Sequence, residues 1–159
     1  MTASNKYIKF IKTSSELGAG TRGASKGYLA LENAAKSKKS KLLSKFATIE
    51  INDKNNALIN EPKFEFAKRI KELSNIFSDL SSTVKQQLNN NIFPILISGD
   101  HSSSLGTIAG IKAAYPNKNV GVIWIDAHAD VHTPYTSPSG NMHGMPLAAS
   151  LGLNHILLN

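Results

Sequence analysis

Two short and almost entirely apolar runs restrict the folds open to this chain more than any other feature. They are FPILIS at residues 93–98 and VGVIWI at residues 120–125. A strand with one face in water alternates apolar and polar residues, whereas unbroken runs of this length are typical of strands covered on both faces. We therefore expect both runs to be central strands of a parallel sheet.

Strand and helix patterns alternate along the rest of the chain. Further β-type runs lie at residues 7–11 and 46–51, and helical periodicity covers residues 25–36, 62–88 and 102–114. The serines at 102–104 are expected to cap the last of these helices. Strand, helix, strand order predicts an α/β fold with three α/β/α layers and a mainly parallel sheet. Because no linker interrupts the pattern, residues 1–159 are expected to form one domain.

The composition removes several classes of protein. The chain has no cysteine, which excludes a disulfide scaffold, a thiolate metal site and a cysteine nucleophile. Its apolar runs are far shorter than the ~20 residues of a membrane span, and the N-terminus shows no secretory signal. We expect a cytoplasmic protein without a membrane partner.

The net charge of +7 raises the question of a nucleic-acid partner. The excess lies wholly in residues 1–79, and it is densest in the lysine-rich stretch at residues 36–45. No aromatic residue or arginine interrupts that stretch, so a solvated lysine face explains it better than a polyanion site. We expect no nucleic-acid partner.

Acidic and histidine residues follow both apolar runs directly. The first run leads into Asp100 and His101, and the second leads into DAHAD, with Asp126, His128 and Asp130. The carboxyl ends of parallel strands form the ligand-binding edge of such a sheet. An extended backbone would place the three polar residues of DAHAD on one face. Clustered carboxylates and imidazoles need a compensating charge, and this donor set suits one or two Mn²⁺ or similar ions.

Two simpler interpretations compete with a metal site. An isolated Asp-His pair at a strand end is more often a hydrogen-bonding arrangement. A Ser-His-Asp hydrolase would use one of the serines at 102–104 beside His101, but the chain has no GxSxG elbow, and a serine cluster after a strand is a simple helix cap. Because the two acidic clusters follow successive strands, the metal site is the favoured interpretation.

Three motifs together resemble the ureohydrolase superfamily. They are GDHSSSLGT, WIDAHAD and TPYTSPSGNMHGMPL, and the last resembles arginases in particular. More weakly, ELGAGTRGASKG is similar to the first glycine-rich loop of that superfamily, so the resemblance extends over nearly the whole chain. It implies an arginase-like fold.

The resemblance also implies a reaction and a metal centre. His101, Asp126, His128 and Asp130 match ligands of a binuclear manganese centre, whose bridging hydroxide attacks the guanidinium carbon of L-arginine to give urea and L-ornithine. Asp130 would also orient that hydroxide. His143 matches the histidine that shuttles a proton to the departing amine, a role that an imidazole pKa of ~6.5 suits.

Substrate recognition is implied for the loop before His143. Ser137, Ser139 and Asn141 match the neutral donors that bind the α-carboxylate, while His132 stands where most arginases have asparagine. This departure leaves agmatine, formimidoylglutamate or another guanidino compound open as the substrate. The SPSGNMHG segment argues against an agmatinase, because that branch does not share it.

One family motif is missing from the sequence. The family completes its metal centre with a later aspartate pair in a motif like DxDxxDP, whereas the last acidic residue here is Asp130. We therefore expect the N-terminal part of an arginase-like polypeptide, with a sheet incomplete at its C-terminal end, weak or single-metal binding and little activity alone. The full-length parent is expected to be a homo-oligomer, either a trimer or a hexamer. The alternative is a non-catalytic binding or oligomerisation module.

Overall fold

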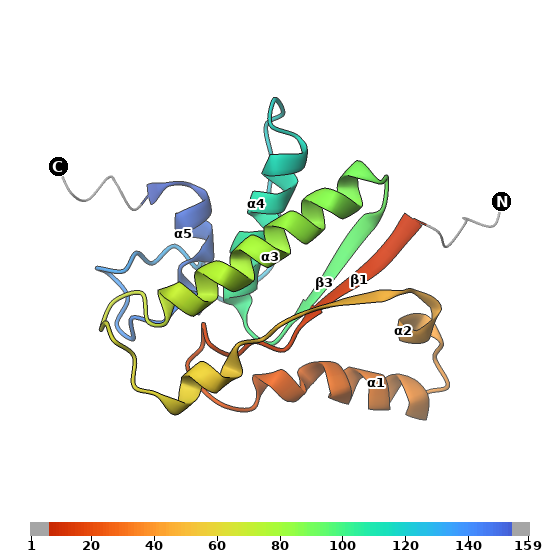
Figure 1. The fold of residues 1–159 in the computed structure, drawn as a ribbon, viewed down its shortest axis with the longest axis horizontal. Helices are drawn as coiled ribbons and strands as arrows, with labels where there is room; N and C mark the ends of the chain where they lie inside the picture. Colours follow the sequence, from red (N-terminus) through yellow and green to blue (C-terminus); the bar gives the residue numbers. More distant parts are fainter. Residues whose placement is uncertain (1–6, 154–159) are drawn as a thin grey trace.

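A three-stranded parallel sheet organises the computed structural model, which describes residues 7–153 (Figure 1). The strands are β1 (Ile8–Thr13), β2 (Thr48–Ile51) and β3 (Phe93–Ser98), in the order β2-β1-β3. In the register of this sheet, Thr13 of β1 lies opposite Ile51 on one side and Ser98 on the other. The three runs expected at 7–11, 46–51 and 93–98 are therefore confirmed as strands.

Helical segments follow each of the three strands along the chain. The α-helices are α1 (Gly27–Ser37), α2 (Leu42–Lys45), α3 (Ile70–Asn89), α4 (Ser104–Ala114) and α5 (Pro146–Ser150). Short 3₁₀ helices are η2 (Ala24–Lys26), η3 (Asn55–Ile59), η4 (His101–Ser103) and η5 (Met142–Gly144). The helices expected at 25–36 and 102–114 are confirmed, the second as η4 followed directly by α4. Among residues 7–153, no helix is both long and apolar enough to cross a bilayer.

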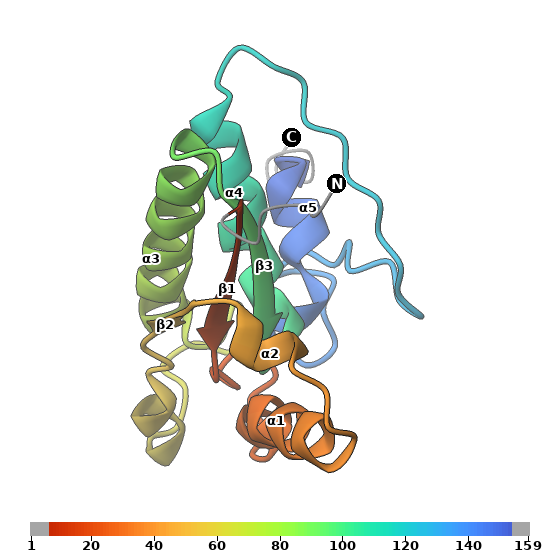
Figure 2. The same ribbon diagram turned by 90° about the vertical axis from the view of Figure 1, so that its right-hand side faces the viewer.

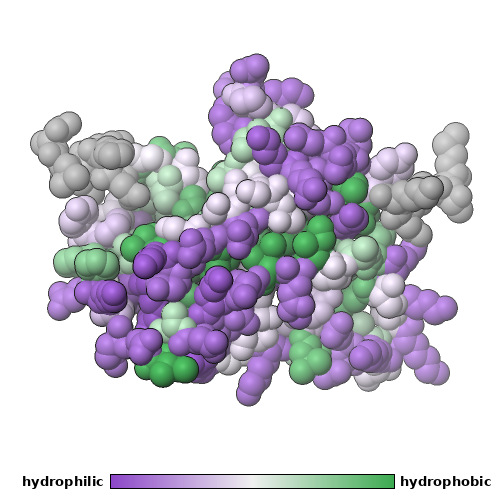
Figure 3. All heavy atoms as spheres, in the orientation of Figure 1, coloured by the Kyte–Doolittle hydropathy of each residue, from purple (hydrophilic) through white to green (hydrophobic). Residues whose placement is uncertain are grey.

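The sheet lies between helices on its two faces, which confirms the expected α/β layering. Ile11 of β1 is fully buried with the inward side of α3, whose buried residues in the same core are Leu73, Ile76, Leu80 and Val84. Neighbouring residues of a strand point to opposite faces, so Phe10 points the other way, where it shares an apolar cavity with Leu31 of α1. The outward side of α3 is mainly hydrophilic (Figure 3).

Helix α4 packs closely on α3 because two of its residues are glycines. A Cβ added at Gly110 would lie 2.7 Å from both the Ser81 carbonyl oxygen and the Val84 Cβ of α3. At Gly106 it would lie 2.9 Å from the Leu80 Cβ. The side chain of any other residue would therefore push the two helices apart.

The prediction of a strand at residues 120–125 is wrong. This segment leaves α4 and runs apart from the sheet (Figure 2). Within residues 7–153 its backbone pairs with no other backbone group, and Ile123 and Ile125 are 91% and 94% exposed. An apolar run shows what a segment can bury, but a strand exists only where a neighbouring strand satisfies its N–H and C=O groups.

The long helix expected at 62–88 begins later, at Ile70. Ala67 and Arg69 have φ values of 48° and 57°, in the left-handed region that a right-handed helix cannot contain. Between them, the Lys68 N–H donates to the Gly140 carbonyl at 2.9 Å. Residues 62–69 therefore form an irregular segment that contacts a distant loop. The expected single domain over 1–159 also includes residues 1–6 and 154–159, which lie outside the described part.

Candidate metal centre

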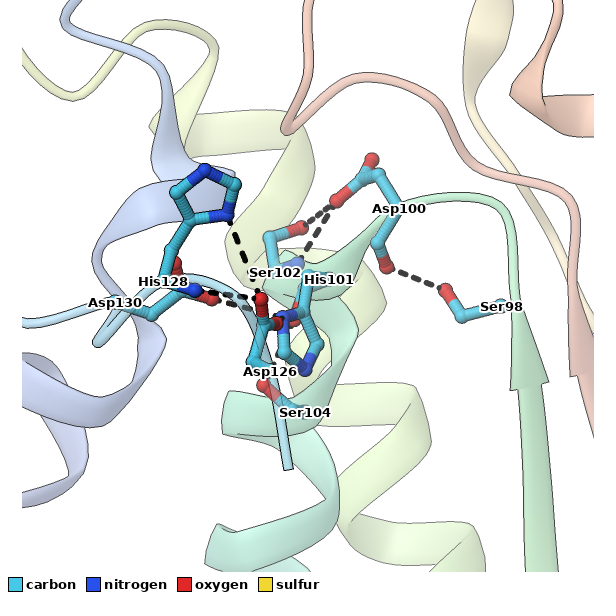
Figure 4. A network of polar contacts seen from close by, with 8 residues as sticks. All are labelled: Ser98, Asp100, His101, Ser102, Ser104, Asp126, His128 and Asp130. Atoms are coloured by element: carbon cyan, nitrogen blue, oxygen red, sulfur yellow. Dashed lines mark hydrogen bonds and ion pairs between the residues drawn. The ribbon is translucent and has the colours of Figure 1, made fainter. Parts of the chain in front are cut away.

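His101 meets two carboxylates at the end of β3 (Figure 4). Its Nδ1 lies 2.9 Å from Asp126 Oδ2 and 2.8 Å from Asp130 Oδ2. The histidine opens η4, directly after β3, whereas both aspartates come from the loop after the unpaired segment 120–125. The two acidic clusters thus lie together, as the sequence predicts, although the second apolar run is not a strand.

The three side chains of this group differ in their exposure to solvent, and one of them stacks on an aromatic ring. The exposed fractions of the His101, Asp126 and Asp130 side chains are 42%, 21% and 9%. The imidazole of His101 stacks on the Trp124 indole, with ring centroids 4.5 Å apart. This contact holds the ring against the protein while leaving it accessible. Trp124 was not among the residues expected at the site, and its position one residue before Ile125 carries no signal of this role.

The DAHAD segment is not extended, so the expectation that its polar residues share one face of a strand is wrong. Asp126 Oδ1 accepts the His128 N–H at 2.9 Å and bends the chain there. Asp130 has a φ of 51°, and its carbonyl accepts N–H groups of Leu147 and Ala148 at the start of α5. These bonds, rather than strand geometry, aim the Asp126 and Asp130 side chains at His101.

His128 lies at the margin of this group. Its side chain is 83% exposed, and its Nδ1 is 3.5 Å from Asp126 Oδ1. The ligand atoms that lie within 4.8 Å of one another belong to His101, Asp126 and Asp130. The structure therefore brings together three of the four expected ligands and places the fourth beside one of them.

The carboxylate of Asp126 is held in its charged form. The backbone N–H of His128 lowers the pKa of Asp126 most; burial opposes this effect, and the imidazoles of His101 and His128 add to it. An ionised carboxylate at neutral pH is the state that binds a cation.

The donor set fits a divalent cation. Two carboxylates and an imidazole are ligands for Mn²⁺ and related ions. An octahedral ion with ligands at ~2.1 Å separates its donor atoms by about 3 to 4 Å, and the three atoms here lie within 4.8 Å of one another. Three protein side chains and solvent are sufficient for one such ion.

Asp100, the residue before His101, fixes the turn from which that histidine projects. Its carboxylate accepts the Ser102 N–H at 2.9 Å and the Ser102 hydroxyl at 2.5 Å. It also accepts the Gly18 N–H at 2.9 Å. The expected capping by serines is therefore wrong, because Asp100 caps this turn. The Ser102 and Ser104 hydroxyls donate to Asp100 and to the His101 carbonyl, and the Ser103 hydroxyl accepts from Ser98. Asp100 was not predicted as a site residue, although an aspartate just before a helix is a recognisable cap signal.

A cavity adjoins the candidate metal-binding group of His101, Asp126 and Asp130. Its volume is about 510 Å³, and Asp130 forms part of its wall. The expected substrate-binding and proton-shuttling residues all line it: His132, Ser137, Ser139, Asn141 and His143. The structure therefore brings this whole set together, next to a member of the candidate metal-binding group.

Internal hydrogen bonds shape the loop that forms this wall. Ser137 Oγ accepts the Gly140 N–H at 3.0 Å, and Ser139 Oγ accepts the Asn141 N–H at 3.2 Å. Both hydroxyl groups keep their own hydrogen for another acceptor. Gly140 has a φ of 69°, and a Cβ there would collide with the Glu65 carbonyl, so this turn requires glycine.

The glycine-rich loop at residues 16–23 holds the cavity from the other side. Asn141 Nδ2 donates to the Ala19 carbonyl at 2.8 Å, which uses one of its two N–H groups. The His143 N–H donates to the Gly18 carbonyl at 3.1 Å. His132 Nδ1 lies 3.3 Å from Thr136 Oγ1. The weaker motif of the sequence analysis is therefore a direct neighbour of the candidate site.

Arginases of other organisms are similar to this chain in sequence. The chain is 38% identical over 156 residues to the arginase of Bacillus subtilis, covering 95% of this chain and 50% of that protein. It is 46% identical over 106 residues to the arginase of Entamoeba histolytica, covering 62% of this chain and 36% of that protein.

Solved structures agree with these relatives. The crystal structure of Entamoeba histolytica arginase with L-ornithine superposes with a TM-score of 0.73 at 35% identity, over 92% of this chain and 50% of that chain. For Bacillus caldovelox arginase the TM-score is 0.72, over 92% and 49%. The chain thus spans about half the length of the arginase structures it matches. The region aligned with the Entamoeba histolytica sequence covers a smaller share of that relative. Since the model of the arginase family matches residues 9–157, the protein belongs to the arginase family.

Proposed function

We propose that this chain supplies part of the active site of a manganese-dependent arginase, which hydrolyses L-arginine to L-ornithine and urea. The observation that carries the proposal is the convergence of His101 with Asp126 and Asp130 beside a cavity. These three residues would bind metal, with His128 as a fourth ligand because its ring lies next to Asp126. A bound divalent cation, or a pair of them, supplies a water-activating Lewis acid.

His143 is the proposed proton-transfer residue. It lines the same cavity as Asp130, and its backbone N–H is fixed to Gly18. An amine leaves the tetrahedral carbon only with a proton, and an imidazole titrates near neutral pH. The proposed role of Asp130 is to orient the attacking water toward the guanidinium carbon in this cavity.

The neutral groups on the cavity wall would recognise the amino acid end of the substrate. The hydroxyl groups of Ser137 and Ser139 and the remaining N–H of Asn141 are donors for an α-carboxylate. His132 would be a further donor in the tautomer that carries its hydrogen on Nε2, because its Nδ1 faces Thr136 Oγ1. A substrate without the carboxylate would leave these donors unpaired, which disfavours agmatine.

The proposal also concerns the complete enzyme of which this chain would be a part. The described residues bring three ligand side chains together, with His128 beside them, so a two-metal arginase centre would need ligands in addition to this group. A cytoplasmic location, a homo-oligomeric parent and a single domain over residues 1–159 stay predictions.

A chimera tests the activity. This chain is fused to the part of Bacillus subtilis arginase that follows the aligned region, and urea release is measured with Mn²⁺ on L-arginine and on agmatine. We expect urea from L-arginine, with agmatine turned over far more slowly. His143→Ala should lower the rate by ~10²–10⁴-fold while Mn²⁺ binding stays unchanged.

Three results would contradict the proposal. They are a folded, Mn²⁺-binding chimera that releases no urea, a His143→Ala variant as fast as its parent, and equal turnover of agmatine. The first of these would favour the non-catalytic binding module.

A further inference from the structure

The loop at residues 137–141, which carries the proposed donors for an α-carboxylate, rests on a distant part of the chain. Residues 65–69 lie against it, just before α3 (Figure 1). The Lys68 N–H donates to the Gly140 carbonyl at 2.9 Å, and the Glu65 carbonyl lies so close to Gly140 that a Cβ there would collide with it. Two backbone groups of residues 65–69 therefore fix the turn of this loop.

A pair of aromatic rings joins the same two parts of the chain. The ring centroids of Phe66 and Tyr135 are 6.2 Å apart, and the two side chains are otherwise largely in solvent, with exposed fractions of 52% and 61%. Tyr135 lies two residues before Ser137. Residues 65–69 therefore contact the start of the loop as well as its turn.

Arg69 makes a third contact. A Cβ added at Gly20 would lie 3.4 Å from Arg69 Nη1 and 3.1 Å from Asn141 Oδ1, so the guanidinium group and the Asn141 amide lie against the same glycine. Asn141 Nδ2 donates to the neighbouring Ala19 carbonyl at 2.8 Å. Arg69 thus packs on the glycine-rich loop at the point where that loop holds the Asn141 amide.

The backbone of residues 65–69 is set for these contacts. Ala67 and Arg69 have φ values of 48° and 57°, a left-handed conformation that residues other than glycine seldom adopt. Such conformations persist where the surrounding structure fixes them, and they cluster at ligand-binding sites. None of residues 65–69 lines the cavity, so they can act on a substrate only through the loop.

We infer that residues 65–69 are a positioning element for substrate specificity. They hold Ser137, Ser139 and Asn141 in the arrangement that accepts an α-carboxylate, and they thereby set the preference for an α-amino acid over the amine that lacks this group. For the identity of the ligand, the inference rests on the proposed function. The α-carboxylate is remote from the reacting guanidinium carbon, so its contacts contribute equally to the bound substrate and to the transition state. Loss of such contacts raises KM and leaves kcat unchanged.

Two matched pairs of variants test the inference. Phe66→Ala removes the ring beside Tyr135, and its control is Phe64→Ala, at a 63% exposed phenylalanine outside this ring pair. Gly140→Ala places a Cβ against the Glu65 carbonyl. Its control is Gly152→Ala, because Gly152 has the same φ of 69° but nothing within 4 Å of an added Cβ.

Steady-state kinetics of the chimera with Bacillus subtilis arginase separate positioning from a general loss of structure. Phe66→Ala and Gly140→Ala should raise KM for L-arginine by roughly tenfold and leave kcat within about twofold. KM for agmatine, which has no carboxylate, should stay within about twofold of the parent. Both controls should match the parent on both substrates. A general loss of folded enzyme would instead lower kcat on both substrates alike.

Hydrogen exchange on the 159-residue chain, without metal or substrate, gives a readout that needs no activity. The Asn141 N–H is bonded to Ser139 Oγ, and the Lys68 N–H to the Gly140 carbonyl. Exchange within residues 133–141 should become roughly tenfold faster in Phe66→Ala and Gly140→Ala. It should keep the parent's rate in Phe64→Ala and Gly152→Ala.

Three outcomes overturn the inference. They are an unchanged KM for L-arginine in both test variants, an equal rise in KM for agmatine, and exchange in residues 133–141 that matches the parent. A parent chimera that releases no urea would count against the proposed function alone, and the exchange rates would then still decide whether residues 65–69 position the loop.

Discussion

The Asp100 carboxylate accepts a hydrogen bond from the backbone N–H of Gly18, 82 residues earlier in the chain, at 2.9 Å. The same glycine accepts the His143 N–H through its carbonyl. One residue of the glycine-rich loop therefore contacts both the neighbour of His101 and a residue of the adjoining cavity. A Cβ at Gly18 would collide with the Ser102 side chain, so this position requires glycine.

Asp100→Asn should destabilise the fold. An amide group replaces one acceptor oxygen with a donor, which then faces the N–H of Gly18 or the donors of Ser102. Losing a buried hydrogen bond to a charged group costs about 1.5–3 kcal/mol of the free energy of unfolding, measured by urea denaturation. Asp79→Asn, at an exposed position of α3, should change it by less than ~0.5 kcal/mol. Equal effects of the two variants would refute the role of Asp100.

Gly110→Ala should also destabilise the fold, because its Cβ would meet the α3 backbone at Ser81. Overpacking of this kind costs ~1–3 kcal/mol, seen as a lower thermal midpoint. Gly27→Ala is the matched control, since a Cβ there meets nothing within 4 Å. Alanine is the better helix former, so the control should be neutral or stabilising by up to ~1 kcal/mol. A Gly110→Ala variant as stable as its parent would show that α4 does not pack this tightly.

Glu16 should make stability depend on pH in the acid range. Burial opposes ionisation of this carboxylate, but the N–H groups of Ser25 and Gly23 and the charge of Arg22 outweigh it and lower the pKa of Glu16 below its ordinary value of 4.5. A lowered pKa stabilises the folded state fully above pH ~4.5, and this contribution is lost as the pH falls through the folded-state value.

Glu16→Gln removes this contribution. The variant should unfold more readily at pH 7, by ~1–3 kcal/mol, and its stability should fall less between pH 5 and acid pH. Denaturation at several pH values measures both effects, with Glu61→Gln at an exposed position as the control. Parallel pH profiles for the Glu16 variant and its parent would contradict the assignment.

The pattern of apolar residues correctly predicted the strands whose neighbouring strands lie within residues 7–153. The run at 93–98 is a strand because β1 is beside it, whereas the equally apolar run at 120–125 has no neighbouring strand among residues 7–153. Apolar periodicity also could not show that α3 begins at Ile70. That boundary depends on Lys68 bonding to Gly140, a contact between distant parts of the chain.

The site was predictable at the level of residue types and spacing. Asp and His at successive run ends predicted that His101 would meet Asp126 and Asp130, and it does. The direction of His128 depends on a bend made by the Asp126 side chain, which the spacing of DAHAD does not reveal. Stacking of Trp124 on His101 depends on tertiary placement alone.

Mn²⁺ titration of the 159-residue chain, followed by the electron paramagnetic resonance signal of the free ion, tests the metal centre directly. Three gathered side chains predict saturable binding of one ion per chain. Asp130→Asn, which keeps the shape of the side chain but removes its charge, should abolish this binding, and Asp79→Asn should leave it intact. No saturable binding by the parent, or binding that survives Asp130→Asn, would contradict the assignment of His101, Asp126 and Asp130 as the metal site.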